Sequence, residues 1–299
     1  MADASPSTAP SLGRDALSGR LEKALAALAT ESGPATAWKR AWILTAVGRY
    51  DDALGACAEA MQGGPLLQAS ALMTEGMLYR QISLHERAEE VDARALELLQ
   101  TAKLRTPAVR AGIRIGQVAD AVGMGADESL LSRRLRLAAS AATAAGSWRQ
   151  GVRLTWVKGE VYMVRGAFAQ ASRVFAAGAK VASDQGARRH HAKSLIFLAA
   201  SRAASGDRSE ARRIVQRGLQ LAARCGAAPL IWPAELILAE VDPERSPHHL
   251  DRARQFAGGV IETLPERLRS EALQRPPARW LLGGADVVAP PPAFPATDA

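Results

Sequence analysis

The sequence predicts an all-α fold built from many short antiparallel helices. No good run of alternating β-branched residues occurs, so strand signals are scarce. Apolar residues make up 48% of the 299 residues but aromatic residues only 5%, so Ala, Leu, Val and Ile must form most of the core. Breaks containing Gly, Pro or Ser recur along the chain. Helix pairs at this rate favour an array over a single bundle.

The domain organisation follows from composition. Residues 1–13 are rich in Ser, Pro and Ala, and we expect a loose tail there. Residues 14–285 carry the helical pattern and form the predicted array. Residues 286–299, "DVVAPPPAFPATDA", indicate a second tail, rich in Pro and Ala and with a polyproline tendency.

The clearest repeat unit is "GEVYMVRGAFAQASRVF", residues 159–175. Gly159 and Tyr162 lie on one predicted helix, and a turn separates them from a second helix. On that second helix Phe168, Ala171 and Phe175 share one face at a 3.6-residue period. This pattern resembles the tetratricopeptide repeat, whose signature runs Gly-x2-Tyr, a turn, then Ala-x3-Phe.

Weaker copies of the unit are anchored by alanines. Ala53 and Ala88 are 35 residues apart, and Ala171 and Ala211 are 40 apart. The interval of 83 residues from Ala88 to Ala171 leaves room for one degenerate copy. The sequence therefore predicts about five repeats between residues 32 and 226, of about 35–41 residues each, followed by terminal capping helices near residues 246–273.

The resemblance to the tetratricopeptide superfamily implies a right-handed α-solenoid of antiparallel helix pairs. Small residues permit close approach of the backbones, and stacking of neighbouring pairs completes the core. The longer repeats resemble those of bacterial regulators and scaffold proteins.

No catalytic, cofactor-binding or metal site is expected. The sequence contains no phosphate-binding loop, HExxH, CxxC or EF-hand motif. Cys57 falls at a core position of its repeat, and Cys225 ends a helix, so neither thiol is predicted to be a nucleophile. The adjacent histidines at 190–191 and 248–249 point in different directions on a helix and do not chelate easily.

The chain is predicted to be cytoplasmic and to have no membrane association. Its first residues, "MADASPSTAP", lack the features of a signal peptide, and its longest apolar stretches are too short to span a bilayer. The formal charge is +8, with 32 Arg, 6 Lys and no Asn. Two explanations remain open: a codon bias of GC-rich genomes, or a surface suited to anions.

The candidate site is a concave groove, because the first helix of each pair lines the groove in arrays of this type. The predicted groove residues are Trp38, Lys39, Trp42, Met77, Arg80, Arg110, Arg114, Gln117, Arg153, Trp156, Glu160, Lys193 and Phe197. Basic and aromatic side chains together suit a protein or peptide segment that carries carboxylates and apolar anchors. The alternative is ordinary packing between repeats beside a solvated basic face. The absence of Asn argues against the paired-Asn clamp of the best-known peptide-binding tetratricopeptide domains.

The preferred function is a non-catalytic protein-interaction scaffold or regulator. The alternative is a nucleic-acid-binding protein that uses the same groove. Against it, the acidic residues Asp120 and Glu160 are expected to interrupt the basic groove. An enzyme is the third reading, with no motif in its favour.

Overall fold

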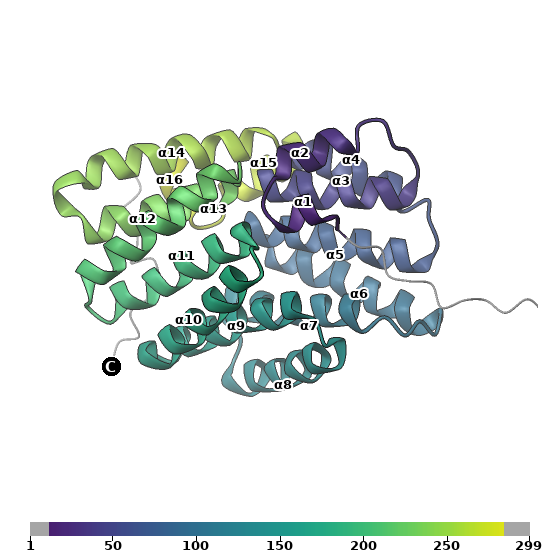
Figure 1. The fold of residues 1–299 in the computed structure, drawn as a ribbon, viewed down its shortest axis with the longest axis horizontal. Helices are drawn as coiled ribbons and strands as arrows, with labels where there is room; N and C mark the ends of the chain where they lie inside the picture. The colour runs from purple at the N-terminus through teal and green to yellow at the C-terminus, as the bar shows by residue number, and fades with distance from the viewer. Residues whose placement is uncertain (1–11, 284–299) are drawn as a thin grey trace, which may run out of the picture.

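The computed structural model describes residues 12–283, which contain sixteen α-helices, one 3-10 helix and no strand (Figure 1). The all-α prediction is confirmed. The predicted tails lie outside the described residues, apart from Leu12 and Gly13 at the end of the first. Leu12 is buried against the core.

Six antiparallel helix pairs make up the body. They are α3 (Pro34–Val47) with α4 (Tyr50–Ala60), α5 (Pro65–Gln81) with α6 (His85–Thr101), α7 (Pro107–Gly123) with α8 (Glu128–Ala145), α9 (Trp148–Val164) with α10 (Phe168–Asp184), α11 (Arg188–Ala204) with α12 (Arg208–Arg224), and α13 (Ala228–Val241) with α14 (Ser246–Glu262). The short helices are α1 (Arg14–Leu17), α2 (Leu21–Ala27), η1 (Pro243–Arg245), α15 (Glu266–Leu273) and α16 (Ala278–Leu282). The pair α13–α14 is thus a sixth repeat, where the sequence predicted only terminal helices.

Small residues allow the helices of a pair to approach closely, as the repeat pattern predicts. A Cβ atom added to Gly159 on α9 would lie 2.2 Å from the ring of Phe175 on α10. The same ring stacks on Phe197 of α11, with 5.1 Å between the ring centres. Ala171 is fully buried on the same helix. Phe175 therefore fills the space between one pair and the next.

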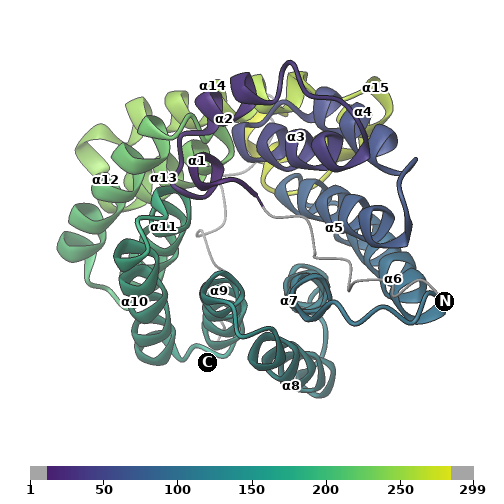
Figure 2. The ribbon, with the colours of Figure 1, turned by 45° about the vertical axis from the view of Figure 1, so that its right-hand side comes forward.

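The array closes on itself, a feature the sequence did not predict. In Figure 2 the helices from α3 to α13 surround a central space, and α14 and α15 lie beside α3 and α4. Thr263 joins the two ends: its Oγ1 accepts a hydrogen bond from the Tyr50 amide at 3.1 Å, and its carbonyl accepts one from the Asp51 amide at 2.9 Å.

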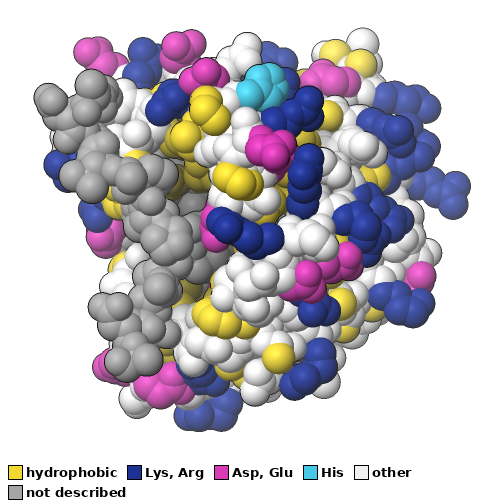
Figure 3. Space-filling model, turned by 90° about the vertical axis from the view of Figure 1, so that its left-hand side faces the viewer, with side chains coloured by type: hydrophobic (Ala, Val, Ile, Leu, Met, Phe, Trp, Pro, Cys, Tyr) yellow, Lys and Arg dark blue, Asp and Glu magenta, His cyan; other side chains and the backbone are white. Residues whose placement is uncertain are grey.

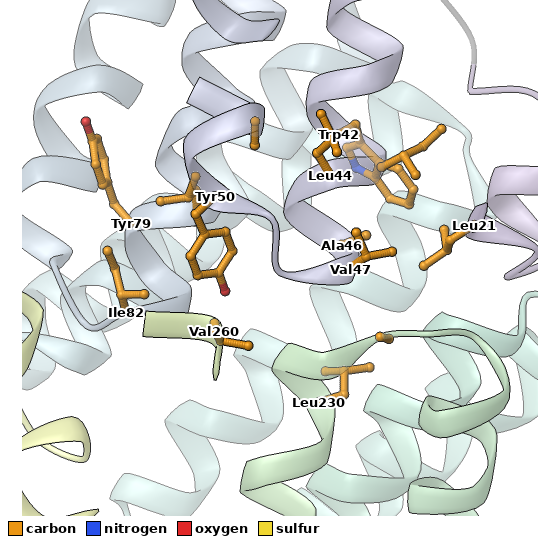
Figure 4. Close-up of a cluster of buried hydrophobic side chains, with 14 of the residues drawn as sticks. Leu21, Trp42, Leu44, Ala46, Val47, Tyr50, Tyr79, Ile82, Leu230 and Val260 are labelled. Atoms are coloured by element: carbon orange, nitrogen blue, oxygen red, sulfur yellow. The ribbon is translucent and has the colours of Figure 1, made fainter. Parts of the chain in front are cut away.

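Apolar and ionic contacts complete this seam. Figure 4 shows Leu230 and Val260, from the last pair, facing Val47 and Tyr50 of the first. Arg87 on α6 donates two hydrogen bonds of 2.6 Å to the carboxylate of Glu271 on α15. The first and last repeats therefore share one hydrophobic core instead of ending in solvent.

Within residues 12–283, no helix is both long enough and apolar enough to cross a bilayer. The same range holds no group of three or more His, Cys, Asp or Glu residues placed to bind a metal ion.

Candidate functional site

The ring of first helices encloses a cavity of about 350 Å³. Every first helix from α3 to α13 contributes to its wall, so the closed array creates the cavity. Trp42, Trp156 and Trp232 supply large apolar faces from three different helices. The cavity lining therefore contains both aromatic surface and charged groups.

Four cationic side chains face the cavity from two neighbouring helices: Arg149 and Arg153 on α9, and Arg189 and Lys193 on α11. Among the described residues, no carboxylate forms an ion pair with any of these four groups. Their contacts are aromatic or neutral instead. The guanidinium carbons of Arg149 and Arg189 lie 5.1 and 5.8 Å from the centre of the Trp42 ring.

The other two cations have similar surroundings. The Lys193 ammonium lies 4.7 Å from the centre of the Trp156 ring. Arg153 donates to the side-chain oxygen of Gln150 at 3.1 Å and to the carbonyl of Gly112 at 3.4 Å. Cation–π contacts and neutral acceptors stabilise these charges without neutralising them.

Burial lowers the pKa of each arginine in this group, and repulsion from neighbouring arginines adds to the effect at Arg149 and Arg153. The pKa falls to about 9 for Arg149, and to about 10 for Arg153 and for Arg189. All three remain protonated at neutral pH. Burial, reinforced by the neighbouring arginines and lysine, holds the pKa of His190 well below its usual range, so that imidazole is neutral.

Glu160 is the one carboxylate that lines the cavity among the described residues. Burial raises the pKa of Glu160 and lowers that of Lys193, and each charge partly offsets the shift of the other. The wall therefore carries a net positive charge.

Arg80 also reaches the cavity, but its charge is neutralised. Its Nη1 lies 2.8 Å from Asp92 on α6 and 2.7 Å from Asp120 on α7. Asp120 also contacts Nδ1 of His85 at 3.2 Å. Gly116 makes room for this cluster, because a Cβ atom there would lie 2.6 Å from Asp92 and 2.7 Å from Arg80.

This cluster corrects two expectations. Arg80 is not a free groove cation, since two fully buried carboxylates hold it. Asp120 does not interrupt the groove, because its side chain is buried with Arg80 and does not line the cavity. Of the two acidic residues that were expected to interrupt the basic groove, Glu160 lines the cavity and Asp120 does not.

The structure brings eight of the thirteen predicted groove residues to the cavity wall. They are Trp42, Met77, Arg80, Arg153, Trp156, Glu160, Lys193 and Phe197. The other five, Trp38, Lys39, Arg110, Arg114 and Gln117, do not line it.

Local contacts explain why several of the predicted groove residues do not line the cavity. Trp38 is buried between helices, and its indole N–H donates to the carbonyl of Ser70 at 3.1 Å. On α7 the predicted helical phase was wrong: Gly116 and Ala119 face the cavity, and Arg114 instead donates to Gln117. The repeat copy that contains α7 is degenerate, so its sequence pattern did not determine which face of the helix points to the cavity.

Sequence reasoning missed Arg149, Arg189 and His190 in the wall. A signal was present, because Arg149 precedes Arg153 by four residues and Arg189 precedes Lys193 by four, and such residues share one helix face. Extending the predicted face by one turn toward each helix start would have found them. Trp232 was missed because α13 was not predicted to be a wall helix.

Arginines on the outer surface differ from those in the cavity. Figure 3 shows Lys and Arg spread over one outer face with Asp and Glu among them. Several make local ion pairs, such as Arg213 with Glu210 at 2.6 Å and Arg254 with Asp251 at 2.9 Å. The overall Arg excess is thus widely distributed, and the cavity is distinguished by cations that outnumber Glu160, the one carboxylate of the described residues in its lining.

Neither cysteine of the described residues is placed to act as a nucleophile. Burial raises the pKa of the Cys57 thiol to about 12 and also raises that of Cys225. His85 is oriented by Asp120, but among the described residues no hydroxyl or thiol hydrogen-bonds to its ring. A histidine–carboxylate pair activates a nucleophile only when that nucleophile reaches the imidazole.

The chain matches no protein-family model, and it matches no curated protein by sequence. Its fold is similar to that of a Rap protein solved in complex with Competence and Sporulation Factor, with a TM-score of 0.58, 14% identity, and coverage of 89% of this chain and 79% of that one. It also resembles the apo form of RapI, with a TM-score of 0.45, 10% identity, and coverage of 89% and 80%. The first likeness supports the predicted tetratricopeptide-like helical-repeat fold.

Proposed function

We propose that the protein is a non-catalytic interaction module that binds an acidic, partly apolar protein segment in its central cavity. The observation that carries this proposal is the group of cations on α9 and α11 that have aromatic neighbours and no carboxylate partners. Carboxylates of a partner would replace the missing counter-charges, and Trp156 and Phe197 would contact apolar side chains. The Rap protein of similar fold was solved with a factor bound, which supports a binding role.

The test uses the full chain and fluorescein-labelled peptides of about eight residues that contain Asp or Glu together with Leu, Phe or Trp. A matched set with Lys in place of the acidic residues is the control. Fluorescence anisotropy should show binding of the acidic set only, weakening with salt but persisting at high salt, because apolar contacts are not screened.

Variants place the binding in the cavity. Arg153→Glu should weaken acidic-peptide binding by at least about tenfold, the effect of losing roughly 1.4 kcal/mol. Arg114→Glu is the matched control, since Arg114 is also a partly buried arginine of a first helix but lies outside the cavity lining. Equal loss in both variants, or none in either, would remove the cavity as the site.

The nucleic-acid alternative gives a different result in the same assay. A labelled single-stranded oligonucleotide would bind, and its affinity would fall steeply with salt as counterions are released. Such binding, without binding of any acidic peptide, would replace the proposed function.

A further inference from the structure

We propose that Arg149, Arg153 and Arg189 form a preorganised subsite for an oxyanion, either a phosphate group or a carboxylate. This inference deepens the proposed function, because it names the ligand group that the cavity recognises and the residues that hold it. Arg149 and Arg189 were outside the sequence-based site, and neither belongs to any motif of the chain.

The first support is the missing counter-charge. The side chain of Arg189 is buried, with 6% of the residue exposed, and no carboxylate among the described residues pairs with it. Placing several like charges together in a buried site is costly unless an opposite charge compensates them. The same protein supplies two buried carboxylates to Arg80, so the fold can neutralise a buried arginine where the arginine is structural.

The second support is a set of buried donors without acceptors. Nε of Arg149, Nε of Arg189 and Nε1 of Trp42 are buried and have no hydrogen-bond partner in the structure. All three atoms carry N–H groups that can only donate. Most buried donors in proteins are satisfied, so three unsatisfied ones around a single cavity indicate a ligand that accepts several hydrogen bonds.

These donors come from different helices and line the same cavity. The two guanidinium groups lie over the same Trp42 ring, at 5.1 and 5.8 Å from its centre, one from α9 and the other from α11. Nδ1 of the buried His190 beside them is also unpartnered. An oxyanion presents several lone-pair sites in different directions, which matches donors that approach from several sides.

The chemistry excludes other ligand classes. A cation would be repelled by the arginines, and an uncharged apolar ligand would leave the buried N–H groups unsatisfied. The cavity of about 350 Å³ is larger than one phosphate or carboxylate, so the anionic group can carry an apolar remainder against the aromatic wall.

Two sources of the oxyanion are possible, and both use the same chemistry. It can be a carboxylate of the bound segment, or a free phosphate-bearing small molecule. The experiment therefore has one arm without peptide and one with it.

In the first arm, the melting temperature of the full chain is measured during titration with sodium phosphate at constant ionic strength, with sodium chloride as the balancing salt. Phosphate should raise the melting temperature by about 3 °C or more once its concentration is well above its dissociation constant. Isothermal titration calorimetry should show saturable binding. Chloride alone should give no saturable rise.

The variants Arg149→Met and Arg189→Met should each weaken phosphate binding at least about tenfold. Arg114→Met, with its arginine outside the cavity, should keep the parent response. Each Met variant should fold, because it removes an unpaired charge and keeps most of the side-chain volume. The melting temperature without phosphate verifies this for each variant.

In the second arm, binding of the acidic peptide is repeated with phosphate present. A rise in the apparent dissociation constant in proportion to phosphate shows that a peptide carboxylate uses the subsite. Simultaneous binding shows that the anion is a separate small molecule. Either result, together with the variant losses, supports the subsite.

The subsite and the proposed function can fail separately. Saturable phosphate binding that depends on Arg149 and Arg189, without any peptide binding, supports the subsite and overturns the proposed function. No saturable phosphate binding, together with peptide affinity unchanged in Arg149→Met and Arg189→Met, overturns the subsite and leaves the proposed function standing.

Discussion

Two arginines with little exposed surface lie on first helices of this protein, about 110 positions apart in the chain, and their surroundings are opposite. Arg80 on α5 is held by Asp92 at 2.8 Å and by Asp120 at 2.7 Å, and both carboxylates are fully buried. Arg189 on α11 is buried, but its neighbours are the Trp42 ring and the cations Arg149 and Arg153.

The difference separates a structural charge from one that is available to a ligand. The ion cluster at Arg80 links α5, α6 and α7, and removing one member would leave a buried charge uncompensated. The group at Arg189 links α9, α11 and α3 only through aromatic contacts, and its charge is already uncompensated. Burial alone therefore does not distinguish a structural arginine from one that is available to a ligand. The presence or absence of a paired carboxylate makes that distinction.

The strongest test of this comparison is Arg80→Met. The substitution leaves Asp92 and Asp120 close together in a buried site without a cation, so it should lower the free energy of unfolding by about 3–5 kcal/mol. Urea denaturation followed by circular dichroism measures the change. The loss should be greater at pH 8 than at pH 5, because burial raises the pKa of Asp92 to about 7, so that this carboxyl is neutralised by protonation at the lower pH.

A triple variant tests whether the uncompensated carboxylates cause the loss of stability in Arg80→Met. Arg80→Met combined with Asp92→Leu and Asp120→Leu removes all three charges and should recover much of the loss. If Arg80→Met alone unfolds no more easily than the parent protein, the cluster is not structural.

The second test is Arg189→Met, for which we expect the opposite sign. Removing an unpaired buried charge should raise the free energy of unfolding by about 1–2 kcal/mol in the absence of anions, since the depressed arginine pKa values reflect unfavourable burial. Urea denaturation in a chloride buffer without phosphate is the measurement. A loss as large as that of Arg80→Met would show that the two arginines have the same role.

The third and smallest effect concerns pH and His190. Burial and the nearby cations lower the pKa of His190 in the folded protein, whereas a histidine in the unfolded chain titrates near 6.5. Below about pH 6.5 the unfolded chain therefore binds a proton that the folded chain does not, and the parent loses stability as the pH falls.

The variant His190→Gln has no imidazole at this position, so it should not show this loss of stability at low pH. Between pH 7.5 and pH 5.5, the free energy of unfolding of the parent should fall by about 1 kcal/mol more than that of the variant. Denaturation curves at the two pH values give the difference. A difference that does not change with pH would show that His190 can be protonated in the folded state and that the cavity is less positive than its lining indicates.

The sequence predicted the helical array well, because the Gly, Tyr and Ala anchors are set by contacts within one pair or between neighbours. Ala171 and Phe175 are buried where the repeat pattern puts them. The wall was predicted best on α9, which carries the clearest repeat, and on α11 next to it; it was predicted worst on α7, where the repeat signal is weak.

Contacts between distant parts of the chain could not be predicted from local patterns. Nothing near Arg80 shows that Asp120, 40 residues later, would neutralise it. Likewise, the hydrogen bond from Tyr50 to Thr263 joins residues 213 positions apart. Such contacts depend on the summed rotation of all the repeats, which no single repeat encodes.

The seam at Thr263 has a consequence for how the protein can vary. An open solenoid can gain or lose repeats at its ends, because each unit contacts only its neighbours. Here the first and last pairs share hydrogen bonds and a hydrophobic core, so the number of units is fixed by the circumference. Duplicating or deleting one pair would separate Tyr50 from Thr263 and expose both edges, so this chain is expected to vary by substitution and by changes in loop length while its repeat number stays constant.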